Sequence, residues 1–146
     1  MKLLRLSISG FRNYGEESVE FGPDVNVISG TNAQGKTNLL EAVYLLTGAH
    51  SFRTRFDKDL IGFGCGWADI LADVESGERQ QTIRILLRKG QRRSITVNAV
   101  KKNASELSGV MTAVLFSPDD LYIIKDGAQA RRKLMDTAIG QLRPGY

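Results

Sequence analysis

Hydrophobic and polar residues alternate in the first part of the chain in the way that β-strands require. The alternation covers residues 4–8 and 19–21, and a short, nearly continuous apolar run follows at 25–28. Alternation predicts a strand with one buried face, and a short apolar run predicts a strand that is buried on both faces. We therefore predict three strands within the first 28 residues.

A helical period replaces this alternation after Gly35. The apolar residues that follow are spaced so that they share one face of a helix, at Leu39, Leu40, Val43 and Leu46. Gly48 is a typical helix stop. The sequence predicts a helix that begins at Gly35 or Lys36 and ends before Gly48.

Alternation resumes beyond a loop at residues 48–60. It predicts strands at 67–74, 83–87 and 95–97, with turns at Ser76–Gly77, Lys89–Gly90 and Asn98–Ala99 and one more buried strand at 110–116. Consecutive strands joined by short turns form an antiparallel meander. Alanine at position 99, where glycine would complete an Asn-Gly turn, makes a type I′ turn less favourable.

Two helices are predicted to close the chain. Ser117 suits the N-cap of the first, Pro118 its first position, and Asp119 and Asp120 its first turn. The second is predicted from 128 to 142, where apolar residues recur every four positions. Alternatively, the apolar run that begins at Val114 could end at Asp119 as an acidic strand end that binds Mg²⁺. Pro118 and the capping residues favour a helix start instead.

Composition excludes several classes of protein. The chain has 146 residues, the usual size of a single domain, with one cysteine, Cys65, and one histidine, His50. These residues cannot form an internal disulfide, a multi-cysteine zinc site or a histidine-based metal cluster. No apolar stretch is long enough for a membrane span and no signal peptide is evident, so a cytoplasmic protein without membrane partners is expected.

The net charge of +4 is concentrated in one part of the chain. Residues 79–102 hold eight of the twenty basic residues and no acidic one, so the rest of the chain is net negative. A basic cluster is a typical footprint for the phosphates of nucleic acid, and the candidate DNA-binding residues are Arg88, Lys89, Arg92 and Arg93. The alternative is a solvated hairpin face whose charges prevent edge-strand aggregation.

The segment Gly30–Thr37, "GTNAQGKT", matches the phosphate-loop pattern G-x-x-x-x-G-K-[ST] between a predicted strand and a predicted helix. Its glycines permit close approach of backbone N–H groups to phosphates, and the helix N-terminus attracts the same anion. Lys36 would contact the β- and γ-phosphates, and Thr37 would hold Mg²⁺. The predicted ATP-phosphate residues are Gly30, Thr31, Asn32, Ala33, Gln34, Gly35, Lys36, Thr37 and Asn38.

The surroundings of this loop resemble a known family. The motifs are "ISGFRNY", "GTNAQGKTNLLEAVYLLTG", "SFR" and "VLFSPDDLYIIKDGAQARRKLMD". Together they resemble the N-terminal ATPase segment of the RecF family, within the RecF/SMC group of ABC-type ATPases, over essentially all 146 residues. Ala128 departs from the pattern, since proline usually stands there.

The resemblance implies an α/β fold, with residues 1–146 forming the N-terminal lobe of an ATPase head: a mixed sheet around the phosphate-loop helix and an adjoining antiparallel meander. The signature loop, the Walker B strand and the helical arm of such heads are absent from this sequence. Arg12 and Asn13 correspond to positions near the nucleotide, the alternative being an ordinary loop pair. Asp119 occupies the place of the Q-loop.

The resemblance also implies a function for a longer protein. Such a protein would form an ATP-dependent homodimer, bind single-stranded or gapped duplex DNA, hydrolyse ATP slowly and help load a recombinase with RecO- and RecR-type partners. The fragment alone is expected not to hydrolyse ATP, because half of the catalytic parts are absent. The alternatives are the head of another SMC-like coiled-coil ATPase and a phosphate-loop kinase of small molecules.

Four further side chains could each have either a functional or a purely structural role. Arg53 and Arg55 could reach phosphate or DNA, or form surface ion pairs with nearby aspartates. Tyr44 and Trp67 are predicted to be core residues rather than platforms for stacked bases.

Overall fold

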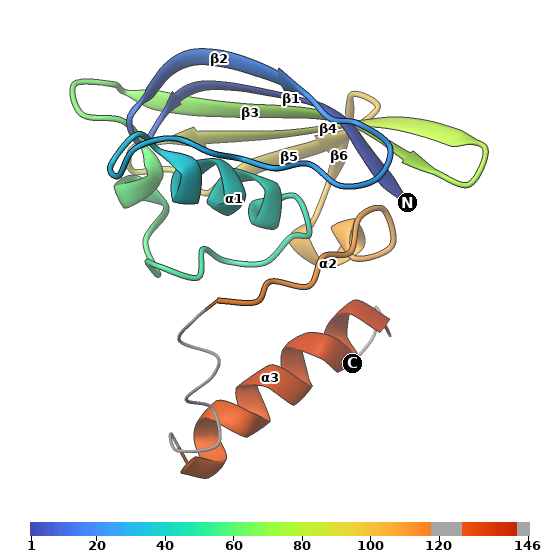
Figure 1. The fold of residues 1–146 in the computed structure, drawn as a ribbon. Helices are drawn as coiled ribbons and strands as arrows, with labels where there is room; N and C mark the ends of the chain where they lie inside the picture. Colours follow the sequence, from blue (N-terminus) through green and yellow to red (C-terminus); the bar gives the residue numbers. More distant parts are fainter. Residues whose placement is uncertain (118–126, 143–146) are drawn as a thin grey trace.

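The computed structural model describes residues 1–117 and 127–142. Its elements are β1 (Lys2–Phe11), β2 (Tyr14–Glu20), α1 (Lys36–Leu45), the 3₁₀-helix η1 (Asp57–Leu60), β3 (Trp67–Ser76), β4 (Arg79–Arg88), β5 (Ser94–Val97), β6 (Val100–Lys102), α2 (Ala104–Leu107) and α3 (Gly127–Leu142). Figure 1 shows the sheet as one layer, with α1 beneath it and α3 on the same side.

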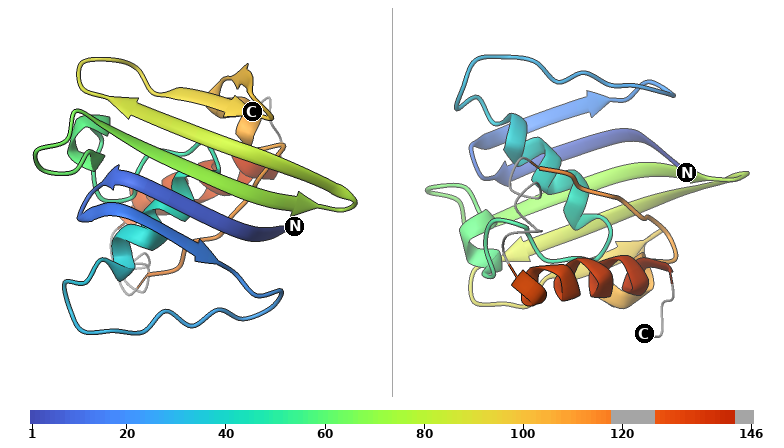
Figure 2. Two further views of the ribbon diagram at one scale, coloured as in Figure 1. Left: turned by 90° about the horizontal axis from the view of Figure 1, so that it is seen from above. Right: turned by 60° about the horizontal axis from the view of Figure 1, so that its bottom comes forward.

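The six strands form one antiparallel sheet in the order β2-β1-β3-β4-β5-β6. The predicted meander is therefore continuous with the first two strands, and the described residues form no mixed sheet. Alternate residues of the strands face α1 and are buried, for example Ile8, Ile70 and Ile85. No element of the described residues covers the opposite face, as Figure 2 shows, and on it Arg5 pairs with Asp73.

Helix α1 confirms the predicted helix, and three of the four residues on its predicted apolar face contact the core: Leu39 and Leu46 are buried and Val43 is partly buried. Leu39, Ala42 and Leu45 are buried against the sheet, whereas Leu40 is 45% exposed. The side chain of Glu41, which lies outside the predicted apolar face, is also fully buried. Three-residue steps from Leu39 set the contact, so Leu40 points outward and Glu41 faces the interior.

Two predicted buried strands, at 25–28 and 110–116, are wrong for the described chain. Neither segment contains a strand, and the side chains of Val25 and Val114 are 86% and 97% exposed. An apolar run becomes a buried strand only where other strands pair with it and other side chains cover it. The described residues pair no strand with either segment, and they bury Met111 but leave Val25 and Val114 exposed.

The last part of the described chain departs from the prediction in two further ways. The short helix α2 was not predicted, although Asn103 and Glu106 have the spacing of an N-terminal capping box, and the Glu106 carboxylate accepts a 2.7 Å hydrogen bond from the Asn103 backbone N–H. Helix α3 confirms the second closing helix, but Leu134 on its predicted apolar stripe is exposed. The first closing helix, with Asp119, lies outside the described residues.

None of the described helices is long and apolar enough to cross a membrane.

The hairpin that joins β5 to β6 forms despite the alanine at position 99. Its two central residues, Asn98 and Ala99, have φ angles of 50° and 64°. Glycine adopts this left-handed region without the steric cost that Cβ imposes on alanine. We expect Ala99→Gly to raise the free energy of unfolding by about 0.5–1 kcal/mol in urea denaturation. Ala113→Gly, in a segment without regular structure, is the control, and a destabilised Ala99→Gly chain would contradict the expectation.

Candidate nucleotide-binding site

The predicted phosphate loop leads directly into the N-terminus of α1. Gly35 is the N-cap residue with φ 101°, and no side chain caps the helix. The first turn contains no acidic residue. The first backbone N–H groups of a helix have no partner within it, and they carry the positive end of the helix dipole. This helix start therefore presents donors and positive potential to an anion, as a phosphate site requires.

Close packing explains the glycine at position 35. A Cβ atom on Gly35 would lie 2.8 Å from Oδ1 of Asn13, which is too close for a real contact. Tyr14 also approaches, and its hydroxyl donates a 3.1 Å hydrogen bond to the Gly35 carbonyl. The turn between β1 and β2 therefore packs directly against the start of α1.

Lys36 holds its ammonium group at the loop. Its Nζ donates hydrogen bonds to the carbonyl oxygens of Gly30 at 2.7 Å and Thr31 at 2.6 Å. The positive charge thus lies where a phosphate bound to the loop would be within reach. Thr37 is exposed beside it, so its hydroxyl is available to a magnesium ion. These residues fit a magnesium–nucleotide pair, in which the metal would neutralise phosphate charge.

A buried ion pair fixes α1 to the β1–β2 turn. Glu41 is completely buried, and its two oxygens accept hydrogen bonds of 2.8 Å from Nε and Nη2 of Arg12. Ser51 donates a further hydrogen bond to Glu41, and Arg53 lies 3.5 Å from it. Arg12 also donates to the carbonyl oxygen of Asp59 at 2.8 Å. Two separate segments, the β1–β2 turn and the loop between α1 and η1, therefore meet at one carboxylate on α1.

This network shifts the pKa of both partners. Burial alone would raise the pKa of Glu41, but hydrogen bonds from Arg12 and Ser51 and the positive charges of Arg12 and Arg53 outweigh it, so the pKa lies below the ordinary 4.5. The hydrogen bond to Glu41 is the main reason that the pKa of Arg12 is raised. Glu41 is therefore ionised at neutral pH, and Arg12 is its counter-charge.

The residues predicted near the nucleotide differ in their surroundings. Asn13 lies at the loop, and its Oδ1 accepts a 2.7 Å hydrogen bond from Asn38. The Arg12 side chain is only 19% exposed and is engaged by Glu41. Arg53 donates to Oδ1 of Asn38 at 2.5 Å and pairs with Glu41, rather than with the aspartates suggested by the sequence.

The sequence reading missed Glu41 as a site residue. The sequence feature that could have identified Glu41 is a single carboxylate within an otherwise apolar stretch of the predicted helix.

The predicted basic window divides into paired and outward-facing cations. Arg93 is largely buried, and it donates to the Asp57 carboxylate at 2.5 and 2.9 Å and to the Ala49 carbonyl at 3.0 Å. It thereby anchors the β4–β5 turn to the loop that precedes η1. The exposed cations of that turn are Arg88, Lys89 and Arg92.

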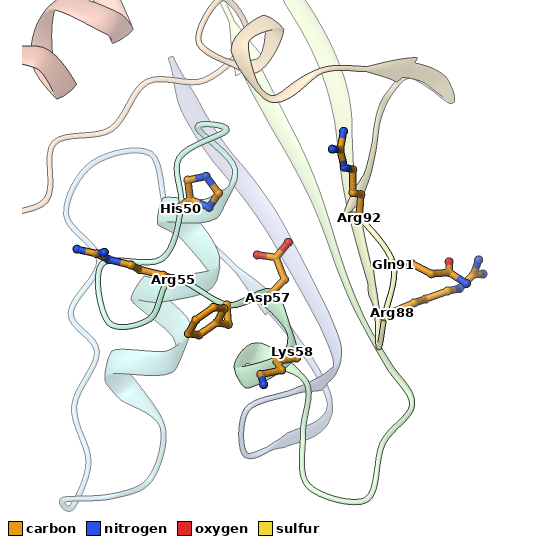
Figure 3. A pocket seen from close by; sticks show the side chains of 9 residues that line it. His50, Arg55, Asp57, Lys58, Arg88, Gln91 and Arg92 are labelled. Carbon is orange, nitrogen blue, oxygen red and sulfur yellow. The ribbon is translucent and has the colours of Figure 1, made fainter.

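An open hollow of about 380 Å³ lies between this turn and the preceding loop. Its lining includes Arg55, Lys58, Arg88 and Arg92. Figure 3 shows that the side chains diverge: Arg88 extends away from Asp57 on the far side of the turn, and Arg55 extends the opposite way. The cations therefore surround the hollow and do not converge on one point inside it.

Comparison with known proteins agrees with this geometry. The sequence profile described as an AAA domain matches residues 5–140. The chain belongs to the AAA domain family. This AAA domain is similar to the DNA replication and repair protein RecF of Acetivibrio thermocellus, at 38% identity over the whole chain and 40% of the relative.

Solved structures extend the comparison to the fold. A structure of the recombination mediator protein RecF–ATPrS in the RecFOR pathway matches with a TM-score of 0.93 at 35% identity, over 99% of this chain and 40% of that one. A structure concerned with ATP-driven dimerization and DNA-stimulated activation of SMC ATPases matches with a TM-score of 0.76 at 23% identity, over 93% and 98%. The latter similarity shows the fold alone.

These comparisons confirm two predictions from the sequence, the similarity to RecF and the α/β fold of an ABC-type ATPase head. The AAA domain spans about 40% of the length of the RecF relatives that it matches.

Proposed function

We propose that this AAA domain is the ATP-binding lobe of a RecF-like DNA repair ATPase, with Gly30–Asn38 holding the phosphates of Mg·ATP. The observation that carries the proposal is the uncapped N-terminus of α1, with the Lys36 ammonium beside the loop. Similarity to a RecF–ATPrS structure supports the same ligand. Calorimetric titration of the chain with Mg·ATP tests it, and heat of binding that saturates at one nucleotide per chain is the expected result.

The proposal for the longer protein follows the RecF relatives. ATP bound at this lobe would join two heads in a homodimer, the dimer would bind single-stranded or gapped duplex DNA, and partners of the RecO and RecR type would assist in loading a recombinase. Two of the similar structures support this sequence of steps. One is described as RecF in the RecFOR pathway, and the other concerns ATP-driven dimerization of SMC ATPases. A small-molecule kinase is less well supported, because the described strands are all antiparallel and form no βαβ unit.

The proposed DNA contact lies at the exposed cations of the β4–β5 turn. We expect Arg88→Glu or Arg92→Glu each to weaken binding of duplex DNA about fivefold and to lower the salt slope by about one, because each removes a phosphate contact. Fluorescence anisotropy at several salt concentrations measures both. Arg93 is unsuitable for this test, because its loss would also break the ion pair with Asp57.

The matched control is Arg79→Glu, the same change in the same basic window. Arg79 pairs with Ser76 at the opposite end of the sheet, so its reversal should leave DNA affinity nearly unchanged. Equal losses in all three variants would indicate attraction by net charge alone, and would contradict a contact at this turn.

A further inference from the structure

Three aromatic side chains are exposed at the end of the sheet that carries the β4–β5 turn. Phe56 is 63% exposed, Phe63 is fully exposed, and Trp67 is 49% exposed. The prediction that Trp67 belongs to the core is therefore wrong, because it lies on the uncovered face of β3. Large aromatic rings normally bury most of their surface, so a group of exposed rings indicates a contact surface.

The aromatic rings alternate with cations. Trp67 is paired with Arg88 in the β3–β4 register, so both side chains lie on the same face of the sheet. Lys89 donates its backbone N–H to the Gly66 carbonyl at 3.3 Å, which brings the turn carrying Phe63 beside it. In the left view of Figure 2 this turn and the β4–β5 turn lie at the same end of the sheet. We call this end the aromatic-basic end.

Phe56 and Lys58 extend the aromatic-basic end to the opposite side of the hollow. The Lys58 ammonium lies 5.5 Å from the centre of the Phe56 ring, a cation–π contact. Both residues line the hollow together with Arg88 and Arg92. Of the three exposed aromatic side chains, Phe56 alone thus lies in the lining of the hollow, with cations from both sides, while Trp67 and Phe63 lie outside that lining.

The nearby carboxylates do not cancel this positive charge. Asp57 is paired with Arg93, and Asp69 on the outer face is paired with Arg84 at 2.6 Å. Each pair is neutral, and the exposed Asp59 carboxylate, which accepts a 2.6 Å hydrogen bond from Thr54, offsets only one of the five exposed basic side chains Arg55, Lys58, Arg88, Lys89 and Arg92. The surface therefore favours a polyanion.

We infer that the aromatic-basic end binds single-stranded nucleic acid, with bases stacked on Trp67 and Phe63 and phosphates along the surrounding cations. The inference rests on the DNA binding proposed above and specifies its form. Diverging cations suit a chain of separated phosphates better than one compact anion, and free bases present flat faces to aromatic rings. A duplex keeps its bases stacked inside and has none to offer to these rings.

Trp67 reports on its own contact, because it is the single tryptophan of the chain. Titration with a short oligothymidylate should quench its fluorescence, since a stacked base changes the surroundings of the indole. An abasic oligonucleotide of the same length carries the phosphates without the bases, and it should bind more weakly and quench less. Equal quenching and equal affinity for the two ligands would overturn the stacking.

Variants separate stacking from charge. Trp67→Ala and Phe63→Ala should each lower the affinity for labelled oligothymidylate about tenfold, while the affinity for a duplex changes little. Phe116→Ala removes an exposed ring on the segment that follows α2, and it serves as the matched control. Circular dichroism and thermal melting establish that each variant is folded.

The outcomes distinguish the two proposals. If both aromatic variants bind oligothymidylate as tightly as the unaltered chain, while Arg88→Glu and Arg92→Glu weaken the binding of DNA, the inference is overturned and the proposed DNA contact stands. If the unaltered chain binds neither oligothymidylate nor duplex, both are overturned.

Discussion

Replacing Lys36 by alanine is expected to weaken the binding of Mg·ATP by about tenfold to a hundredfold. The ammonium group is held at the loop by the carbonyls of Gly30 and Thr31, within reach of a phosphate on the helix N-terminus. A hydrogen bond to a charged partner contributes about 1.5–3 kcal/mol, and alanine supplies neither the donor nor the charge.

Calorimetry on the 146-residue chain measures this effect directly. The matched control is Lys2→Ala, which removes an exposed lysine from the first residue of β1. Thermal melting without nucleotide should give similar midpoints for Lys36→Ala and the unaltered chain, because the lysine contacts only exposed loop carbonyls. ATP binding that survives Lys36→Ala unchanged would contradict the assignment of the phosphate site.

The second large effect is expected from Glu41→Ala, which should lower the free energy of unfolding by about 2–4 kcal/mol. The substitution removes a fully buried carboxylate. Arg12 then lacks its counter-charge, and the Ser51 hydroxyl lacks its hydrogen-bond acceptor. Breaking a buried pair on one side usually costs about 3–5 kcal/mol. The Arg12 side chain is 19% exposed, so water recovers part of this loss.

Urea denaturation of three chains tests this expectation. Asp69→Ala removes the carboxylate of a surface pair with Arg84, and it should cost about 0–1 kcal/mol. Glu41→Gln keeps the size of the side chain and removes its charge, so it should fall between the alanine variant and the unaltered chain. A loss no larger for Glu41→Ala than for Asp69→Ala would show that the buried network contributes nothing beyond an ordinary surface pair.

The lowered pKa of Glu41 adds a pH dependence to the same prediction. Because the unfolded chain binds this proton more readily than the folded chain, the stabilisation is complete above the ordinary pKa and is lost as pH falls through the lower, folded-state pKa. The stability of the unaltered chain should therefore fall in acid more steeply than that of Glu41→Gln. If the free energy of unfolding fell equally steeply with decreasing pH in the two chains, the lowered pKa of Glu41 would be contradicted.

Local signals in the sequence predicted the parts of the molecule that depend on neighbouring residues. The phosphate-loop pattern from Gly30 to Thr37 placed the start of α1, and the turn residues placed the strands of the meander. A glycine-containing loop, a helix start and a two-residue turn are determined by a few consecutive backbone conformations, which their own side chains largely decide. Even the turn at Asn98–Ala99 formed, because the flanking strands impose left-handed angles on its alanine.

The tertiary structure alone decided which side chains are buried and which charges are paired. Val25 and Val114, in two apolar runs predicted to be buried strands, proved exposed, while Glu41 proved to be part of the interior. Burial depends on what covers a segment, and that is determined by strands and helices elsewhere in the chain.

The sequence by itself therefore determined the start of the helix that follows the Gly30–Thr37 motif and the order of most strands, together with an excess of positive charge in residues 79–102. Only the tertiary structure decided that Arg12 is bound to Glu41, 29 positions away, and Arg93 to Asp57, 36 positions away, while Arg92 faces outward. A charge is available to a ligand only when no residue brought near by folding has already paired with it, and no local pattern contains that information.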